Sequence, residues 1–413
     1  MRHDNSVEVK VHGNSSQKIT RRTTILLQLL FALVILVVQF KHDGALEARG
    51  FTRSVVSIES GADHRLNRFQ STLSCDNSTC VLESACVNLR TADLVAFGPD
   101  CDAIKLYLST YKLRWRGDAA PKVLCNEPAG LISDYLPRAV LMTRYVEGQC
   151  GHMFGDEVWT SFRLALEHLS VDQIFQDGIG DLYVHRLRLL KCDDMFGALS
   201  SSVASWPNSS SEVPRKCYKH IYFGTKDLSL TDGYRETQLP YKKSSNFSKH
   251  MSEFRALFYR YAEVDTSEAQ DTIVILQKES GDHLVQFHNL NELVQRAKST
   301  FTSHQVVVTT WSKTSSIEQI RLMSRTAIFI GFTGSDLLSA VFMRDHAQVV
   351  VYCRMFDETV QRRSNEVAVW LQFLSYLNVV QYCDENVRHV NGTDETVHLN
   401  EVNVTVLSTL SVS

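Results

Sequence analysis

The stretch HQVVVTTWSKTSSIEQIRLMSRTAIFIGFTGSDLLSAVFM, residues 304–343, decides the fold class. It reads as an apolar strand, a helix, a second apolar strand, a loop with two glycines, and a further helix. Ser315 and Glu318 have the spacing of a capping box, which predicts the start of the first helix. Apolar strands that alternate with helices are typical of a parallel sheet covered on both faces.

The same alternation continues on both sides of this stretch. Helices are expected at FRALFYRYAEV (254–264) and NLNELVQRAKSTF (289–301), and strands at DTIVILQK (271–278) and QVVVYC (348–353). We therefore predict a C-terminal Rossmann-like α/β domain over residues 246–413. The polar segment LPYKKSSNFSKH, residues 239–250, is the predicted linker that precedes it.

The first half of the chain has a weaker pattern. Between residues 75 and 245 it is rich in cysteine, and it contains the short strand-like pieces ADLVAF (92–97) and IKLYL (104–108). WTSFRLALEHL (159–169) carries apolar residues at helical spacing. We predict a second, N-terminal α/β domain over residues 75–245.

The N-terminus carries an apolar run, Ile25 to Phe40, which approaches the roughly 18 residues of a membrane helix when Thr23 and Thr24 are included. Basic residues precede the run and few follow it, which predicts a cytosolic tail (1–22), a signal anchor (23–40) and a luminal stem (41–74). A cleaved signal peptide is the alternative, but its basic region would be unusually long and no small-x-small cleavage site follows.

Cysteines and glycosylation sequons agree with a luminal domain. All ten cysteines follow the apolar run, which predicts disulfides whose pairing stays open. No Cys-x-x-Cys pair is present, so no structural metal is expected. The net charge of -3 gives no reason to expect nucleic acid as a partner. The expected compartment is the Golgi membrane, with the ER membrane as the alternative. The predicted glycosylation sites are Asn77, Asn208, Asn246, Asn391 and Asn403.

The loop at residues 331–336 is the candidate binding site. In open α/β sheets, ligands bind beyond the carboxyl ends of the strands, and helix N-termini attract anions. Asp336 suits a helix start but would repel a phosphate at the same place. The alternative is that Ser335 or Asp336 only caps the helix. The candidate contacts are Gly331, Thr333, Gly334, Ser335 and Asp336.

The order of these pieces resembles the catalytic domain of glycosyltransferase family 61, above all its EGF-domain-specific O-GlcNAc transferase and plant xylosyltransferase branches. The resemblance covers about residues 75–385. In the first half, QCGHMFGDEVWTSFRL resembles the family's N-x-x-H-x-x-x-D segment and places His152 and Asp156 on its His and Asp, while RKCYKHIYFG matches a stretch around Cys217. In the second half, the residues in register are Asn289, Glu292, Leu293, Gln319, Ile330, Gly331, Gly334, Leu337 and Phe342.

This resemblance implies a GT-B architecture, in which two Rossmann-like domains face each other and the second binds the donor. It implies transfer from UDP-GlcNAc or UDP-xylose with inversion and without a metal or other cofactor. Asp156 and His152 become the candidate acid/base residues, and Lys278 joins the 331–336 loop as a donor-binding residue. Asp100 and Asp102 form a D-x-D sequence outside the nucleotide half, which we interpret as chance.

The chain also departs from the family pattern. The family's H-G-A-G-L is T-G-S-D-L here, so Thr333 replaces His and Asp336 replaces Gly. Lys278 stands in place of Arg and lacks the planar fork that suits a pyrophosphate. Two hypotheses therefore remain: an active, divergent glycosyltransferase, or an inactive relative that serves as a luminal glycan-binding or scaffold protein. His152 and Asp156 have a structural alternative too, as a hydrogen-bonded pair within a helix.

Overall fold

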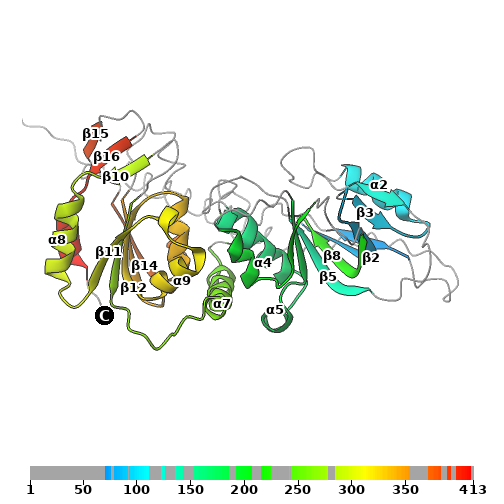
Figure 1. Cartoon of the computed structure of the whole chain (residues 1–413), viewed down its shortest axis with the longest axis horizontal. Coiled ribbons are helices and arrows are strands. Elements are labelled where there is room, and N and C mark those ends of the chain that lie inside the picture. The colour runs from blue at the N-terminus through cyan, green and yellow to red at the C-terminus, as the bar shows by residue number, and fades with distance from the viewer. Residues whose placement is uncertain are drawn as a thin grey trace, which may run out of the picture. The chain divides into compact units, whose positions relative to one another are not determined.

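The computed structural model (Figure 1) describes residues 70–75, 79–91, 93–110, 122–125, 135–142, 153–185, 192–206, 215–224, 230, 241, 243–277, 284–352, 371–382, 388–391 and 397–410. The chain divides into a unit of residues 1–54 and a unit of residues 55–413, and every described residue belongs to the second. The predicted cytosolic tail and signal anchor lie outside the described residues. Within the described ranges, no helix is long and apolar enough to cross a membrane.

The first large sheet is mixed. Its strands follow the order β4-β3-β2-β8-β5-β6-β7, and β1 adds to β2. The pairs of β5 with β8, β5 with β6, and β6 with β7 are parallel, whereas β2 runs antiparallel to β1, β3 and β8. The bounds are β1 Thr72–Cys75, β2 Cys80–Asn88, β3 Asp93–Ala96, β4 Val123–Cys125, β5 Leu136–Met142, β6 Asp181–His185, β7 Val203–Trp206 and β8 Arg215–Phe223.

Two predictions for this region need correction. Residues 104–108 are not a strand but part of helix α2, Cys101–Thr110. Ile104 and Leu108 are buried on one face of this helix, whereas Leu106 between them is 68% exposed. The predicted stem also ends too late, because residues 72–74 already belong to β1, which pairs with β2.

The second large sheet is parallel throughout, as predicted. Its order is β11-β9-β12-β13-β14, and all its pairs are parallel. Every residue of β9 and β12 is buried, which explains why these strands are continuously apolar. The bounds are β9 Thr272–Leu276, β11 Gln305–Thr309, β12 Thr326–Phe332, β13 Ala347–Tyr352 and β14 Leu377–Tyr382.

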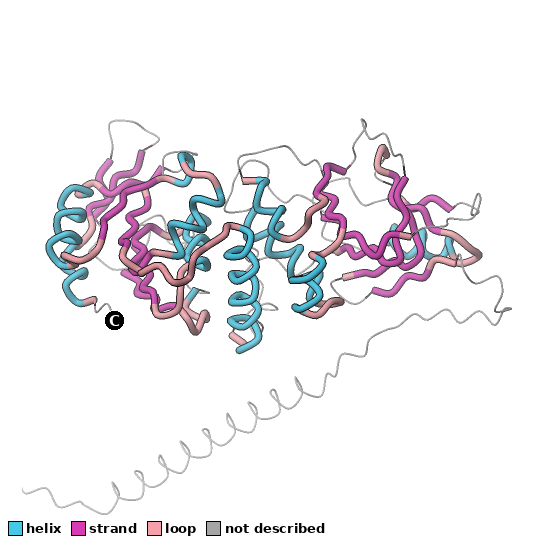
Figure 2. Tube along the Cα trace, turned by 60° about the horizontal axis from the view of Figure 1, so that its bottom comes forward, coloured by secondary structure: helices cyan, strands magenta, loops and turns pink. Residues whose placement is uncertain are grey.

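Helices and short 3₁₀ helices cover the sheets (Figure 2). The capping box of Ser315 and Glu318 is confirmed at the start of α9. The bounds are α4 Trp159–Leu166, α5 Val171–Asp177, η3 Asp193–Ala198, α7 Ser245–Tyr261, α8 Leu290–Thr300, η4 Trp311–Lys313, α9 Ser316–Ser324, η5 Ser335–Phe342 and η6 Val404–Thr409. A small sheet of β10 Leu284–Phe287, β16 Val397–Glu401 and β15 Arg388–Asn391 completes the described fold.

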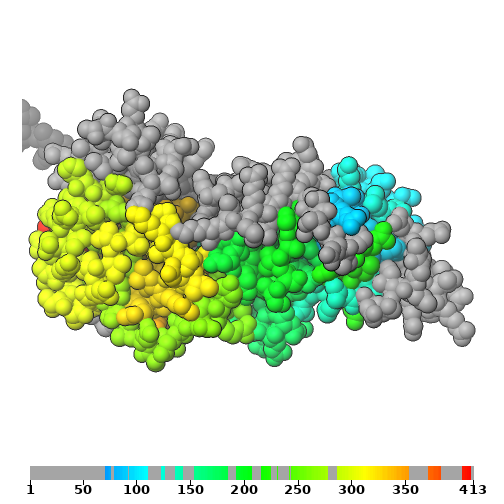
Figure 3. All heavy atoms as spheres, viewed as in Figure 1, coloured from blue at the N-terminus to red at the C-terminus, as the bar shows by residue number. Residues whose placement is uncertain are grey.

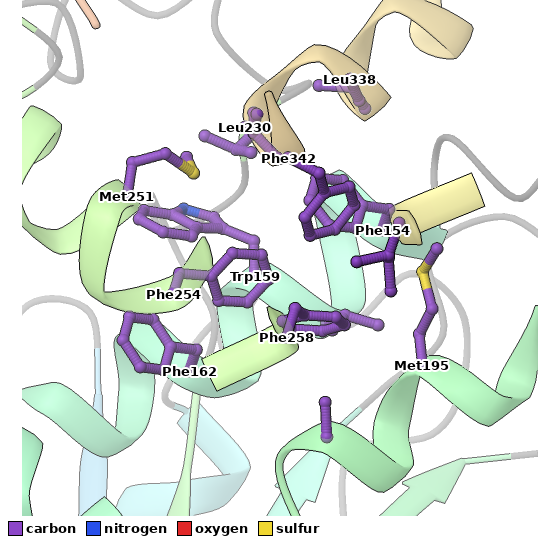
Figure 4. Packing of buried hydrophobic residues seen from close by; sticks show 14 of the residues in the cluster. Phe154, Trp159, Phe162, Met195, Leu230, Met251, Phe254, Phe258, Leu338 and Phe342 are labelled. Carbon is purple, nitrogen blue, oxygen red and sulfur yellow. The ribbon is translucent and has the colours of Figure 1, made fainter. Parts of the chain in front are cut away.

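Helix α7 corrects the linker prediction. Residues 245–250 form its first turns, which Ser244 caps by accepting a hydrogen bond from the Phe247 amide. Phe254 and Phe258 of this helix are buried in one core cluster (Figure 4). The same cluster holds Phe247 and residues of both large sheets, such as Val140 of β5 and Val274 of β9. The mixed α/β class with parallel sheets is confirmed. The GT-B arrangement and the two domain ranges stay predictions.

Disulfides are confirmed in the first half. The bonds are Cys75–Cys80, Cys86–Cys217 and Cys101–Cys125, and Cys192 is disulfide-bonded as well. The first two join residues that lie directly opposite each other on antiparallel strands. These two bonds therefore link β2 to two of its three partner strands, β1 and β8, and disulfides of this kind are consistent with an oxidising compartment.

Candidate functional site

The order of the parallel sheet creates one place where a ligand is expected. From β9 the chain passes to β11 on one side and then to β12 on the other side of β9. The carboxyl ends of β9 and β12 therefore form the topological switch point, where open α/β sheets bind their ligands. The loop after β12 is the predicted site at residues 333–336. Lys278 lies outside the described residues, one position after Gln277, which follows β9.

Gly331 and Gly334 have different tasks in this loop. Gly331 is buried in β12, and a Cβ added to it would lie 3.2 Å from Leu337 Cδ2 and 3.7 Å from Leu276 Cβ. Gly334 has φ 150° and ψ 176°, a conformation that only glycine adopts readily. Gly331 therefore serves packing, and Gly334 permits the turn.

Only some of the predicted donor contacts in this loop are exposed to solvent. Thr333 is fully buried, and its amide donates to the carbonyl of Tyr352 at 3.0 Å. Gly334, Ser335 and Asp336 are partly exposed. Of the predicted donor contacts within the described residues, these three reach the surface, whereas Gly331 and Thr333 do not.

Hydrogen bonding orients the amides of this turn. The Gly334 carbonyl accepts from the Leu337 amide at 3.1 Å and so points into η5. Because the carbonyl and the N–H of a trans peptide point in opposite directions, the Ser335 N–H points away from the helix body. Gly334 is the residue that precedes the helix, and its position excludes the alternative that Ser335 or Asp336 is the N-cap.

Side chains hold the other end of η5. Its last carbonyls have no partner within the helix, and three side chains satisfy them. Tyr376 donates to Val341 O at 3.1 Å, Tyr259 to Phe342 O at 2.6 Å, and Arg255 to Met343 O at 2.6 Å. The helix that starts at the candidate site is therefore anchored at its far end.

The sequence interpretation missed a second loop that contacts the site. Trp311 begins η4 directly after β11, and its indole Nε1 donates to the carbonyl of Asp336 at 3.1 Å. Gln319 of α9 is 5% exposed, and its amide donates to the carbonyls of Trp311 at 3.3 Å and Thr314 at 3.2 Å. A tryptophan at the end of an apolar strand was the available signal. In Figure 3 the yellow segment with α9 reaches the surface.

Asp156 lies in a π-helix. Residues Met153–Val158 form a buried π-helix, η2, which continues into α4. Single turns of this kind occur frequently at functional sites. Asp156 is 5% exposed, and His152 lies outside the described residues. The helical pair of His152 and Asp156, and its catalytic role, therefore stay predictions.

Contacts bring the Asp156 segment and the loop segment together. Phe154 of η2 packs edge-on against Phe342 of η5, with ring centroids 5.2 Å apart. Figure 4 shows both rings beside Leu230 and Leu338. Leu230 also donates its amide to the carbonyl of Gly155 at 3.0 Å. The two segments that the sequence singled out, from opposite halves of the chain, thus share one core.

A partly buried polar network includes Arg163 of α4, the helix that follows η2. Arg163 Nη2 lies 2.6 Å from Glu167 Oε1, and Arg163 Nη1 lies 3.0 Å from Nδ1 of His250. The Tyr241 hydroxyl lies 2.9 Å from the same nitrogen. Because Arg163 only donates, Nδ1 must accept and the imidazole is neutral. Burial, then Arg163 and Lys249, lower the pKa of His250 to about 4.

This network predicts a loss of stability in mild acid. The pKa of His250 is about 4 in the folded chain and 6.5 when unperturbed, so the unfolded chain takes up the proton first. The contribution of His250 to the free energy of unfolding is therefore fully present above pH 6.5. It decreases as the pH falls from 6.5 to 4 and does not change further below pH 4. His250→Asn keeps an acceptor near Nδ1 and should show a flatter dependence of the melting temperature on pH in this window. Equal slopes for both proteins would contradict the assignment.

The remaining predicted residues are the D-x-D pair and the glycosylation sites. Asp100 accepts from Gln70 Nε2 at 2.5 Å, and Asp102 lies in the first turn of α2. Asn246 is exposed at the start of α7, and the Asn403 side chain accepts from the Thr405 amide at 3.0 Å. Asn391 ends β15, whereas Asn77 and Asn208 lie outside the described residues. Among the described residues, no three His, Cys, Asp or Glu side chains group as a metal site would require.

A comparison with known families matches residues 130–350 to Glycosyltransferase 61. This range runs from just before β5 into β13, so it contains η2 with Asp156, the loop at 333–336, and Trp311. It covers more than half of the 413 residues. No curated protein matches the chain. The chain therefore belongs to glycosyltransferase family 61.

Proposed function

We propose that this protein transfers a sugar, GlcNAc or xylose, from a UDP-sugar to a luminal glycan or glycoprotein with inversion. Membership of family 61 implies glycosyltransferase activity, with a sugar donor and an acceptor as substrates. The observation that carries the donor proposal is the loop at 333–336. It lies at the switch point of a parallel sheet, opens η5, and directs the Ser335 N–H outward.

The reaction needs two kinds of group. A base must take the proton of the acceptor hydroxyl, and donors or positive charge must stabilise the departing diphosphate. We assign the base to Asp156, with His152 as its partner or as an acceptor-positioning group. The amides of Gly334–Asp336, the Ser335 hydroxyl and Lys278 stabilise the diphosphate. The proposal involves no metal or other cofactor.

The carboxylate of Asp336 would repel a diphosphate bound at this loop, and this repulsion can be tested. Removing its carboxylate takes a negative charge away from the proposed diphosphate site. Asp336→Gly should therefore lower the dissociation constant for UDP, by about three- to tenfold, measured by calorimetry. Trp311 and Ser339 donate to the main-chain carbonyl of Asp336, a group that every variant retains. The variant should therefore fold, with a loss of at most about 1 kcal/mol for an added glycine.

Asp336→Asn is the matched control, because it removes the charge and keeps a side chain of the same size. It should tighten UDP binding in the same direction. If Asp336→Gly does not fold while Asp336→Asn does, the side chain has a structural task. If neither variant changes UDP binding, the carboxylate does not face the diphosphate.

Membrane attachment and compartment are part of the proposal. The apolar run at residues 23–40, the basic residues before it and the disulfides of the first half support a type II protein of the Golgi membrane, with the ER membrane as the alternative. The second candidate function is an inactive relative that binds glycans or serves as a scaffold. The replacements at 333 and 336 favour it.

The experiment that separates the two candidates is an assay of UDP release. The full-length protein is incubated with UDP-GlcNAc or UDP-xylose, with and without glycoprotein acceptors, and a GDP-sugar serves as the control donor. Turnover of one UDP-sugar supports the enzyme. A rise in melting temperature with UDP but no turnover supports the inactive relative. If the protein shows no turnover and UDP does not raise its melting temperature, the proposed donor is wrong.

A further inference from the structure

We propose that Trp311 is a positioning residue that fixes the conformation of the loop at 333–336. The inference rests on the proposed function for the identity of the ligand, a UDP-sugar. The hydrogen bond between Trp311 and the loop is a contact within the chain and does not depend on the identity of the ligand. Trp311 contributes through the loop and is not assigned a contact with the donor.

The topology gives the Trp311 contact its significance. β11 and β12 are not neighbours, because β9 lies between them. The indole extends from the end of β11 to the Asp336 carbonyl beyond β12, with 3.1 Å between Nε1 and the oxygen. This hydrogen bond therefore joins the segments that follow β11 and β12, the two strands that flank β9. It connects Trp311 directly to the loop at 333–336, which is the candidate site.

Trp311 is held on its own side by buried groups. The Gln319 amide fixes the Trp311 carbonyl, and Gln319 itself projects from α9, whose first turn has a complete capping box. The Trp311 ring packs against Phe329 of β12, with centroids 6.2 Å apart and planes at 31°. The indole is therefore a fixed donor rather than a mobile side chain.

Two features of the loop make a fixing hydrogen bond from Trp311 important. Gly334 adds backbone freedom at the point where the chain leaves β12. Asp336 lies in the first turn of a 3₁₀ helix, whose hydrogen bonds have poorer geometry than those of an α-helix. Its carbonyl accepts from both Trp311 and Ser339, the latter at 2.9 Å. These two bonds fix the turn and with it the outward direction of the Ser335 N–H.

The test uses Trp311→Phe in the full-length protein, which keeps an aromatic ring against Phe329 and removes the N–H. We expect the dissociation constant for UDP, measured by calorimetry, to rise about three- to tenfold, the effect of one lost hydrogen bond. Amide hydrogen exchange of a peptide covering 333–337 should become faster without any nucleotide. Trp206→Phe is the matched control, because Trp206 is buried in a separate core cluster on β7. It should leave both measurements unchanged.

The outcomes separate this inference from the proposed function. If the wild type binds UDP and Trp311→Phe changes neither affinity nor exchange, the positioning role is wrong and the proposed donor stands. If the wild type does not bind UDP, the proposed donor fails, and faster exchange in Trp311→Phe still supports the tie. If Trp311→Phe does not fold, Gln319→Met replaces it. That variant removes both amide hydrogen bonds and should shift exchange in the same direction, and unchanged exchange would overturn the inference.

Discussion

Replacing Asp156 by Asn is expected to lower the rate of sugar transfer by two to four orders of magnitude, the usual contribution of a positioned acid/base group. Asparagine has nearly the same size but does not accept a proton at neutral pH. Asp156 is buried in η2, and η2 contacts η5, the helix that follows the proposed donor loop. The rate is measured as UDP release under saturating donor and acceptor.

Asp193→Asn is the control for this variant. Asp193 is also a buried aspartate of the first half, 9% exposed, and begins η3. It should keep transfer within a few-fold of the wild type. UDP affinity should be unchanged in Asp156→Asn, since the proposed base faces the acceptor. A rate for Asp156→Asn close to that of the wild type would remove Asp156 from the mechanism.

Replacing Phe254 by Ala should cause the largest loss of stability, about 3–5 kcal/mol. Phe254 is fully buried, and its ring centroid lies 5.5 Å from that of Phe154, 5.3 Å from that of Trp159 and 4.6 Å from that of Phe258. The substitution leaves a cavity among rings that come from η2, α4 and α7. Thermal and urea unfolding measure the loss.

Phe373→Ala provides the comparison, because Phe373 is only partly buried at the border of the same cluster. It should lose less than half as much stability. The Phe254→Ala variant should also bind UDP more weakly, because Phe154 and Phe258 both pack on Phe342 of η5. A loss below about 1 kcal/mol for Phe254→Ala would mean that the aromatic cluster is not a main support of the fold.

The parallel sheet could be predicted because each of its features is local in sequence. Buried strands such as β9 and β12 are apolar at every position or nearly so, and the capping box of Ser315 marks a helix start. The first half could not be predicted equally well, because antiparallel additions such as the β2–β8 pair depend on distant partners. Helix α7 was missed at its start because its first turn is polar apart from Phe247.

For the candidate site too, features that are contiguous in sequence could be predicted, whereas contacts between distant segments could not. A strand, a glycine loop and a helix are contiguous, so the location of residues 333–336 followed from the sequence. The burial of Thr333 and the tie from Trp311 did not, because they depend on the neighbouring strand β13 and on the strand order β11-β9-β12. The π-helical form around Asp156 was not predicted, and neither were the contacts of Phe154 with Phe342 of η5 and Phe254 of α7, because they join segments distant in sequence.

The most direct test of the central claim is an experimental structure of the protein crystallised with UDP. We expect the diphosphate at the carboxyl ends of β9 and β12, within hydrogen-bond distance of the Ser335 amide and hydroxyl, with Trp311 still bound to the Asp336 carbonyl. UDP bound elsewhere, or no UDP at a concentration that stabilises the protein against heat, would contradict the assignment of the 333–336 loop as the donor site.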